Sequence, residues 1–439
     1  MSSKQITLSD EQQQIFDKII SQKKNIFFTG CAGTGKSLLL KEIIQYYEIN
    51  LGPECIAVTA STGRAAFSIG GTTLHSFAGV GLGKQDAKSL INKAMFNKKL
   101  NTRWNSTKVL VIDEISMLDA NYFDKLDQLA KALRKSSKPF GGIQLIITGD
   151  LLQLPPIAQE SQDKKRIFEA ESWDSCIDEY VALYEVFRQE DLKFAEILTY
   201  IRLGEVTDEV IDFMNSLSQE KVYDSESGPV NLYATRVKAD KYNRENLDNI
   251  DGDIKAYNSI DKYGSGSSKN TLDNCPAVAC LELKMNAQVM LIKNINKDLV
   301  NGTVGTVIGF TDISSNSSTS QLFQLESLPI VRFDLANGRL YTRVISREIW
   351  SQTLPSGDEV ASRKQIPLIL AWAVTIHKSQ GQTIQRLKVD LSDIFESGQI
   401  YTALSRAVSP DTLQVTGFDP DKVMVDNESL QFVVDNKLV

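Results

Sequence analysis

The chain has 439 residues, of which 42% are hydrophobic and 23% charged, and its formal net charge is −7. This length is too great for one ordinary core, so we expect two or more domains of a soluble globular protein. No apolar run approaches the roughly 18 residues of a membrane span, and the opening MSSKQITLSD lacks the features of a secretory signal. We therefore expect no membrane span and an intracellular protein.

The metal-ligating residue types are few and scattered. The five cysteines contain no CxxC pair, which argues against a disulfide framework or a zinc site. The two histidines, His75 and His377, lie far apart in the chain, so a histidine-rich metal site is hard to build. The net acidity alone argues against nucleic acid as a partner. However, residues 87–108 contain six basic side chains and no acidic one, which is typical of either a solvated surface or a DNA contact.

The first half of the chain alternates apolar, strand-like runs with helical patterns. This alternation predicts a doubly wound α/β domain with a parallel sheet. The strand-like runs are residues 25–30, 55–60, 108–114 and 143–150.

The segment GCAGTGKS, residues 30–37, matches G-x-x-x-x-G-K-[ST] between a predicted strand and a predicted helix. Such a loop wraps its N–H groups around phosphates at the start of a helix. We expect Lys36 to reach the β- and γ-phosphates and Ser37 to hold Mg²⁺. The predicted ATP-binding residues of this loop are Gly30, Cys31, Ala32, Gly33, Thr34, Gly35, Lys36 and Ser37.

A second phosphate-handling feature is VLVIDEIS, in which an apolar strand ends at Asp113 and Glu114. We expect Asp113 to bind Mg²⁺ and Glu114 to orient or deprotonate the attacking water. Together with the loop at 30–37, this pair predicts hydrolysis of a nucleoside triphosphate. Arg188 and Arg406 are candidates for the positive charge on the γ-phosphate side, and the alternative for each is a surface or salt-bridged arginine.

After residue 236 the composition changes. Polar, Gly/Ser-rich stretches at 261–270 and 311–321 predict loops. Short strands with glycine turns then predict a small β-barrel inserted into a larger domain, and α/β character returns after residue 366. The predicted strands are residues 287–294, 302–310, 328–334 and 339–346.

Several long motifs occur in a recognisable order. With the phosphate loop, GDLLQLPP and VTIHKSQGQT resemble the superfamily-one helicases. A fuller set resembles the Pif-type (petite integration frequency) DNA helicases over essentially residues 5–420. The motifs of this fuller set are TASTGRAA, GGTTLHSFAGVGLG, VIDEISMLD, PFGGIQLIITGDLLQLPP and LVNGTVGTVIGF.

The resemblance implies an α/β fold of two RecA-like P-loop motor domains with parallel sheets. It implies a small wedge-type insertion in the first and an SH3-like β-barrel insertion in the second. The expected bounds are 1–185 for the first motor domain, with its insertion at about 64–106, and 186–275 with 366–439 for the second. The SH3-like insertion is expected at 276–365.

The resemblance also implies an activity. A Pif-type helicase uses ATP and Mg²⁺ to move 5′ to 3′ on single-stranded DNA and unwinds duplex, forked, DNA–RNA hybrid and G-quadruplex substrates. The implied partners are single-stranded DNA and DNA junctions, with the free protein a monomer. The implied setting is DNA replication, repair, recombination and telomere maintenance, in the nucleus or mitochondrion of a eukaryotic source. Two alternatives stay open: an RNA helicase of the same superfamily, and a nucleotide-dependent DNA-binding switch without unwinding.

The family pattern assigns further residues around ATP. Gln12 is expected at the adenine and Gln153 at the γ-phosphate, while Gln380 and Gly381 line the nucleotide cleft. Arg188 and Arg406 match its arginine fingers. The catalytic set is thus Lys36, Glu114, Gln153, Arg188 and Arg406, and the magnesium ligands are Ser37 and Asp113.

The family pattern also assigns a DNA track. Ser, Thr and His side chains bond phosphates while adding little charge, so a DNA partner is compatible with net acidity. Phe77 is a candidate base-stacking platform, with core packing as its alternative. The predicted DNA contacts are Thr59, Ser61, Thr62, Gly63, His75, Ser76, Phe77, Thr235, Arg236, Thr375, His377 and Lys378.

Overall fold

The computed structural model describes residues 8–80, 85–155, 165–189, 191–221, 227–264, 269–273, 275–296, 298–311, 326–335, 339–353 and 359–439. In this part of the chain the longest helix has 16 residues, which is shorter than the roughly 20 apolar residues that a bilayer crossing requires. Most of the predicted loop at 311–321, and four residues of the loop at 261–270, lie outside the described residues.

The first domain is built on a six-stranded parallel sheet with strand order β3-β2-β4-β5-β1-β6. Alternate residues of its strands enter two different cores: Phe27 packs on one face, and Ile26 and Phe28 on the other. A sheet covered on both faces explains why the strand sequences are apolar throughout. The strands are β1 (Ile26–Gly30), β2 (Ile56–Ala60), β3 (Thr72–Thr73), β4 (Val109–Asp113), β5 (Gln144–Thr148) and β6 (Glu179–Leu183).

Side-chain caps fix where several helices of this domain begin. At α1, for example, the Ser9 hydroxyl accepts from the Gln12 N–H while the Gln12 side chain accepts from the Ser9 N–H. The helices are α1 (Asp10–Ile20), α2 (Lys36–Leu51), α3 (Gly63–Ser68), α4 (Leu74–Ala78), α5 (Ala87–Phe96), α6 (Lys98–Ser106), α7 (Ala120–Arg134) and α8 (Trp173–Cys176). Short 3₁₀ helices are η1 (Pro53–Cys55), η2 (Ile115–Met117), η3 (Pro139–Gly142) and η4 (Ile167–Glu169).

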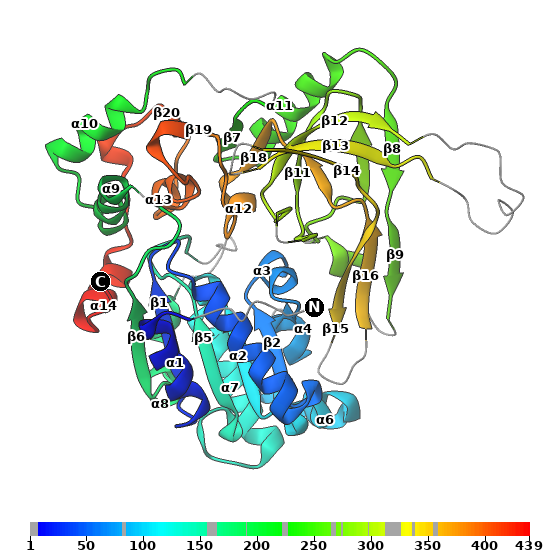
Figure 1. The fold of residues 1–439 in the computed structure, drawn as a ribbon. Helices are drawn as coiled ribbons and strands as arrows, with labels where there is room; N and C mark the ends of the chain where they lie inside the picture. Colours follow the sequence, from blue (N-terminus) through cyan, green and yellow to red (C-terminus); the bar gives the residue numbers. More distant parts are fainter. Residues whose placement is uncertain are drawn as a thin grey trace, which may run out of the picture.

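The second domain has a four-stranded parallel sheet with strand order β18-β7-β19-β20. Its strands are β7 (Val230–Tyr233), β18 (Ala373–Thr375), β19 (Leu387–Asp390) and β20 (Leu413–Thr416). Its helices are α9 (Leu192–Leu203), α10 (Asp208–Ser216), α11 (Arg236–Asp248), α12 (Ile376–Ser379) and α13 (Gln399–Leu404), with 3₁₀ helices η6 (Pro410–Thr412) and η7 (Pro420–Lys422). Figure 1 shows this domain above the first one, with β18 and α12 near the junction.

Antiparallel strands form the β insertion between α11 and β18. They make a five-stranded sheet, β14-β13-β12-β11-β17, a three-stranded sheet, β15-β16-β9, and a pair, β10-β8. The strands are β8 (Lys255–Asn258), β9 (Ile260–Tyr263), β10 (Cys280–Leu283), β11 (Gln288–Leu291), β12 (Val304–Phe310), β13 (Pro329–Asp334), β14 (Leu340–Val344), β15 (Glu348–Thr353), β16 (Glu359–Gln365) and β17 (Leu368–Leu370), with η5 (Lys269–Leu272) among them.

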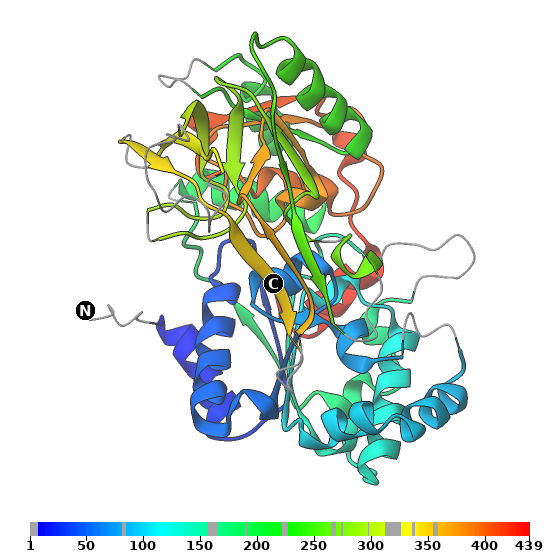
Figure 2. The ribbon, with the colours of Figure 1, turned by 90° about the vertical axis from the view of Figure 1, so that its right-hand side faces the viewer.

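Two parallel sheets with an antiparallel insertion in the second domain confirm the predicted fold class. The insertion's strands begin at Lys255 and end at Leu370, so they extend beyond the expected bounds of 276 and 365 on both sides. In both views the long strands β15 and β16 reach down toward the first domain (Figures 1 and 2). There Phe67 of α3 packs against a small apolar cluster that includes Trp350 of β15.

The C-terminal helix α14 (Asn427–Asp435) follows the second domain in the chain but packs on the first (Figure 1). Val433 is buried in the core of the first domain, and Phe432 stacks on Phe168 with ring centroids 4.4 Å apart. Arg166 anchors the start of the helix through an ion pair of 2.6 Å to Asp426. The chain therefore passes between the two domains twice.

Candidate nucleotide site and interdomain groove

The loop at residues 30–37 lies between β1 and α2, as its sequence predicts. Gly33 and Gly35 have φ angles of +94° and +80°, which glycine adopts without strain. A Cβ atom added to Gly33 would lie 2.7 Å from Cβ of Arg188, so the segment after β6 sits directly on the loop. The loop is therefore shaped both by its own backbone and by the chain that leads into the second domain.

The side chains of Gln12 and Lys36, both predicted to bind ATP, donate hydrogen bonds to backbone carbonyls of this loop. Lys36 Nζ donates to the carbonyls of Gly30 and Cys31, at 2.7 and 2.9 Å, and burial lowers its pKa. The Gln12 amide donates to the Thr34 carbonyl at 3.3 Å and is itself oriented by the cap of α1. The structure thus brings both Gln12 and Lys36 onto the backbone of the same loop.

Asp113 and Glu114 lie at the carboxyl end of β4. Glu114 has a left-handed backbone, with φ of 53°, and its N–H donates to Asp113 Oδ1 at 2.8 Å. Burial, followed by the charge of Glu114, raises the pKa of Asp113 to about 7. Burial also raises the pKa of Glu114, although Lys36 and Arg406 counteract this shift. A strained backbone that presents two adjacent carboxyl groups is typical of a functional site.

Gln380 of the second domain reaches this carboxylate pair. Its Nε2 donates to Glu114 Oε2 at 3.1 Å. Gly381, with φ of +74°, follows it and is exposed. The two residues predicted to line the nucleotide cleft therefore lie beside the predicted water-activating carboxylate, and they come from the other domain.

Both predicted arginine fingers lie close together at the domain junction. Arg188 Nη1 donates to the Ser405 carbonyl at 2.8 Å, while Arg406 donates through Nη2 to the Ser405 hydroxyl at 2.8 Å and through Nε to the Thr402 carbonyl at 2.9 Å. Burial and the neighbouring charge of Arg406 lower the pKa of Arg188 to about 9, and burial lowers the pKa of Arg406. Within the described residues neither guanidinium has a carboxylate within 4.0 Å, so an anionic phosphate would relieve their mutual repulsion.

Gln153 is held by a neighbouring acid that the sequence did not single out. Its Nε2 donates to Asp150 Oδ2 at 3.2 Å, and Asp150 pairs with Arg202 of α9 at 2.9 Å. The sequence carried a signal for Arg202. Its position extends the apolar spacing of Phe194, Ile197, Leu198 and Ile201, so it falls on the buried side of the helix.

Tyr401 of α13 is a second contact that sequence reasoning missed. Its hydroxyl accepts a 2.7 Å hydrogen bond from the Ala32 N–H in the phosphate loop. Tyr401 is buried, and Ala32 packs within the core cluster of the second domain. The phosphate loop is thus in direct contact with both domains.

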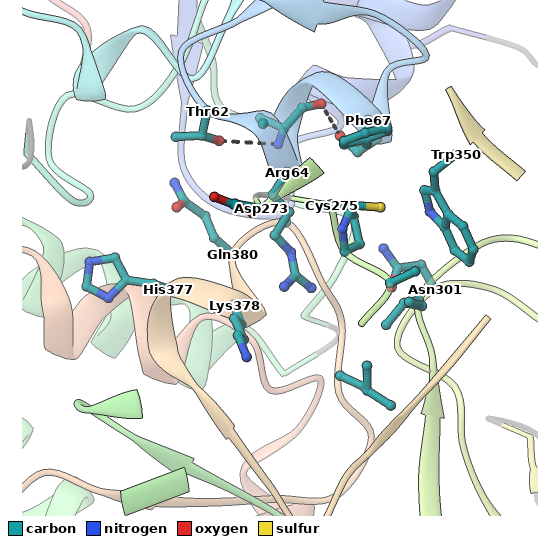
Figure 3. Close-up of a pocket in the computed structure, with 18 of the residues that line it drawn as sticks. Thr62, Arg64, Phe67, Asp273, Cys275, Asn301, Trp350, His377, Lys378 and Gln380 are labelled. Atoms are coloured by element: carbon teal, nitrogen blue, oxygen red, sulfur yellow. Dashed lines mark hydrogen bonds between the residues drawn. The ribbon is translucent and has the colours of Figure 1, made fainter. Parts of the chain in front are cut away.

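A large groove lies between the first domain, the second domain and the β insertion (Figure 3). The carboxylates of Asp113 and Glu114 are among the groups that line it. Nine predicted DNA-contact residues line it, and they come from both sides. From the first domain these are Ser61, Thr62, Gly63, His75 and Ser76, and from the second Arg236, Thr375, His377 and Lys378. The same groove is lined by Ser37, Asp113, Glu114 and Gln380, so the candidate DNA track and nucleotide site adjoin.

Three predicted DNA contacts do not line this groove, and burial contradicts two of them. Phe77 is fully buried and its ring centroid lies 4.9 Å from that of Trp104, so its core alternative holds. Thr59 is buried within β2 and its hydroxyl donates to the Val111 carbonyl at 2.6 Å. Thr235 is half-buried and directly precedes the groove-lining Arg236 at the start of α11, so its DNA contact stays a prediction.

One further groove residue carries charge without having been predicted. Arg64 of α3 lies among the groove-lining residues, and among the described residues no acceptor contacts its guanidinium. Burial lowers its pKa to about 10. Arg64 and Lys378 point from the two domains into the same space (Figure 3). Little in the sequence pointed to Arg64, because a single arginine inside a Gly/Ala-rich motif is also typical of a surface.

The basic stretch at 87–108 forms α5 and α6, which pack against α7. Five of its six basic side chains are exposed, namely Lys88, Lys93, Lys98, Lys99 and Lys108. Arg103 instead turns inward and donates to the carbonyls of Ser76 and Phe77, at 3.2 and 2.6 Å. Arg103 therefore supports the groove-lining α4, while the lysines give the helices a basic surface.

Comparisons with known proteins agree with this arrangement. Residues 7–212 match the family model of the PIF1-like helicase, and residues 269–310 match that of the DNA helicase Pif1 2B domain. The chain is 40% identical to the ATP-dependent DNA helicase PIF1 of Emericella nidulans, over 96% of this chain. It spans 62% of the length of that relative.

Solved structures are similar over nearly the whole chain. The crystal structure of Pif1 helicase from Candida albicans has a TM-score of 0.79 and 43% identity, and the match covers 98% of this chain and 100% of that one. Pif1 helicase from Bacteroides in complex with ADP-AlF3 and single-stranded DNA has a TM-score of 0.66 and 28% identity, with 99% and 98% coverage.

Proposed function

Because this chain belongs to the PIF1-like helicase family, as its motifs predict, we propose that it is an ATP-driven DNA helicase motor that moves 5′ to 3′ along single-stranded DNA. One observation carries the proposal: a single groove joins Asp113 and Glu114 to polar side chains of both motor domains. The relatives named above are DNA helicases, and one of them is bound to a nucleotide analogue and single-stranded DNA.

ATP is proposed to bind with its phosphates in the loop at 30–37 and its adenine near Gln12. Ser37 and Asp113 offer a hydroxyl and a carboxylate, the oxygen ligands that Mg²⁺ prefers alongside phosphate oxygens and water. Among the described residues, no group of three or more His, Cys, Asp or Glu side chains is arranged to hold a metal ion. When bound, Mg²⁺ neutralises charge on the β- and γ-phosphates.

Hydrolysis is proposed to use residues of both motor domains. Glu114 orients a water and accepts its proton as the water oxygen bonds to the γ-phosphorus and the bond to the ADP oxygen breaks. Gln380 fixes the Glu114 carboxylate for this task. Arg188 and Arg406 stabilise the negative charge on the γ-phosphoryl group, and Gln153 contacts it. Because these groups come from two domains, hydrolysis requires the domains to be closed on ATP.

The DNA strand is proposed to lie along the groove and to contact both motor domains. Thr62, His75 and Ser76 hold phosphates on one side, and Arg236, His377 and Lys378 hold them on the other. Closure on ATP and reopening after hydrolysis would shift one set of contacts relative to the other and move the protein along the strand. Forked duplexes, DNA–RNA hybrids and G-quadruplexes are the proposed substrates, and the exposed lysines of α5 and α6 are proposed to meet the duplex junction.

Forked duplexes that carry either a 5′ or a 3′ single-stranded tail test this proposal. The expected result is ATP-dependent unwinding of the 5′-tailed fork alone. Lys36→Ala should abolish ATP hydrolysis and unwinding while single-stranded DNA binding stays largely intact. Unwinding by the Lys36→Ala variant, or unwinding only from a 3′ tail, would contradict the proposal.

The same assay separates the two alternatives. An RNA helicase would prefer an RNA loading strand and would be activated more strongly by RNA than by DNA oligonucleotides. A nucleotide-dependent switch would show slow ATP hydrolysis that single-stranded DNA does not stimulate. Matched DNA and RNA oligonucleotides of one sequence are therefore included as activators.

A further inference from the structure

A buried ion pair connects the two motor domains beneath the nucleotide site. Arg202 Nη2 lies 2.9 Å from Asp150 Oδ1, and the two side chains are 2% and 0% exposed. Asp150 follows β5 of the first motor domain. Arg202 is on α9, whose residues Phe194 and Ile201 are buried in the core of the second. The pair can therefore form only when α9 lies in one particular position relative to the six-stranded sheet.

Asp150 also holds Gln153. Its carboxylate accepts from Gln153 Nε2 and from the Leu152 N–H, each at 3.2 Å. The oxygen that binds Gln153 also lies 3.2 Å from Arg202 Nε. One carboxylate thus orients the proposed γ-phosphate contact, and a residue of the other motor domain orients that carboxylate.

Asp150 has a second cation within electrostatic reach, Lys36. Burial alone would raise the pKa of Asp150, but Arg202 and then Lys36 hold it below its ordinary value. Among the acidic groups that act on Lys36, Asp150 has the largest effect. A buried carboxylate that loses its hydrogen-bonded counter-ion is left as an uncompensated charge, stabilised only by the next cation that acts on it. Without Arg202, that next counter-ion is the lysine proposed to bind the phosphates of ATP.

We infer that Arg202 is a positioning residue that holds Asp150 on Gln153 and away from Lys36. Through this contact the placement of α9 in the second motor domain regulates ATP binding in the first. The inference rests on the proposed function and deepens it. It names Arg202 as the residue through which the position of the second motor domain affects Lys36 in the phosphate loop. By reciprocity, ATP binding also favours the domain arrangement in which the ion pair forms.

A charge-removal series tests this role in the full chain. Arg202→Gln should weaken Mg²⁺–ATP binding by about tenfold, measured by calorimetry, while affinity for a single-stranded oligonucleotide stays within about twofold. Adding Asp150→Asn should restore ATP affinity to within about threefold of the parent, because a neutral side chain no longer attracts Lys36. A purely structural role for Arg202 would lower the melting temperature of Arg202→Gln while leaving the ATP affinity of the folded protein unchanged.

Arg166→Gln is the matched control. It removes another arginine–carboxylate pair between distant chain segments, Arg166 with Asp426, which does not line the groove, and should leave ATP affinity unchanged. If Arg202→Gln alone fails to fold, the neutral Arg202→Gln/Asp150→Asn variant decides: near-parental ATP affinity supports the inference, and a loss of about tenfold or more overturns it. Parental ATP affinity in Arg202→Gln, or failed rescue, also overturns it. Failure of the proposed function is distinguished by a separate measurement, because the parent protein would then show no DNA unwinding.

Discussion

The side-chain amide of Gln380 donates a 3.1 Å hydrogen bond to Glu114 Oε2, so a residue of the second motor domain holds a carboxylate of the first. Glu114 sits in a left-handed conformation on the turn after β4, where its backbone alone does not fix the side chain. In the proposed mechanism this carboxylate activates the attacking water, and a misplacement of about 1 Å can slow such a step about 100-fold. The proposed mechanism thus links the position of the second motor domain to the chemical step through this hydrogen bond.

Replacing Gln380 with Ala should therefore slow ATP hydrolysis more than it weakens ATP binding. We expect DNA-stimulated kcat to fall by about 10- to 100-fold, with KM for ATP changed little, because misplacing a catalytic group mainly affects the transition state. Gln382→Ala is the matched control, since Gln382 lies in the same motif but donates to Asn301 of the loop after β11, at 2.9 Å. Equal losses of kcat in both variants would show that the Glu114 contact is not special.

The contrast between Gln380 and Arg202 shows what sequence reasoning can reach. Gln380 and the loop at 30–37 belong to local motifs, in which the order of residue types reflects one turn of backbone and one chemical task. The partners Arg202 and Asp150 are 52 positions apart, and Tyr401 and Ala32 are 369 apart. No local pattern encodes such a pair, because the contact exists only once the two domains have packed.

For some residues the motif alone does not show whether the side chain faces the groove or the core, and burial in the structure answers this question. Phe77 and Thr59 stand beside groove residues in the sequence, but neighbouring positions on a strand or short helix point in different directions. Their side chains therefore turn away from the groove, where Phe77 meets Trp104 and Thr59 bonds the adjacent strand. Similarly, α14 follows the second domain in sequence, yet its apolar face with Val433 is buried against the first. Periodicity predicts such a face without naming what covers it.

Glu114→Gln should raise the stability of the nucleotide-free protein at neutral and higher pH. Burial raises the pKa of Glu114 above its ordinary value, so folding binds its proton more tightly. Such a group stabilises the fold fully below its unfolded pKa, and this contribution is lost as pH rises through the raised value. Gln cannot ionise, and it also removes a charge that raises the pKa of Asp113.

Thermal melting without nucleotide or Mg²⁺ measures this effect. The Glu114→Gln variant should melt higher than the parent at about pH 8, and the difference should shrink toward about pH 5. The expected scale is on the order of 2 °C for each kcal/mol removed. The variant should also lose ATP hydrolysis. A difference in melting temperature that is constant across this pH range would contradict the assignment of a costly buried charge to Glu114.

His377→Ala should reduce DNA-stimulated ATP hydrolysis more than basal hydrolysis. His377 lines the groove from α12, whereas Gln380, at the end of the same short segment, contacts Glu114. Losing one hydrogen bond to a charged phosphate corresponds to about 1.5 kcal/mol, or about tenfold in the DNA concentration needed for half-maximal stimulation. Titrating an oligonucleotide into ATPase assays measures it. Equal loss of basal and stimulated rates would refute the DNA-side placement.

Arg64→Gln should weaken single-stranded DNA binding and reduce its salt dependence. Each neutralised phosphate contributes about −0.7 to the slope of log affinity against log salt. Several cations of the groove are paired with acids, for example Arg236 with Asp240 and Arg244 with Asp248. We therefore expect the parental slope to correspond to about 3–5 phosphate contacts, and its magnitude to decrease by about 0.7 in the variant. Lys24→Gln is the control, because Lys24 pairs with Glu179 at 2.9 Å and does not line the groove. An unchanged slope in Arg64→Gln would mean that Arg64 contacts no phosphate, and its charge in the groove would then need another anionic partner.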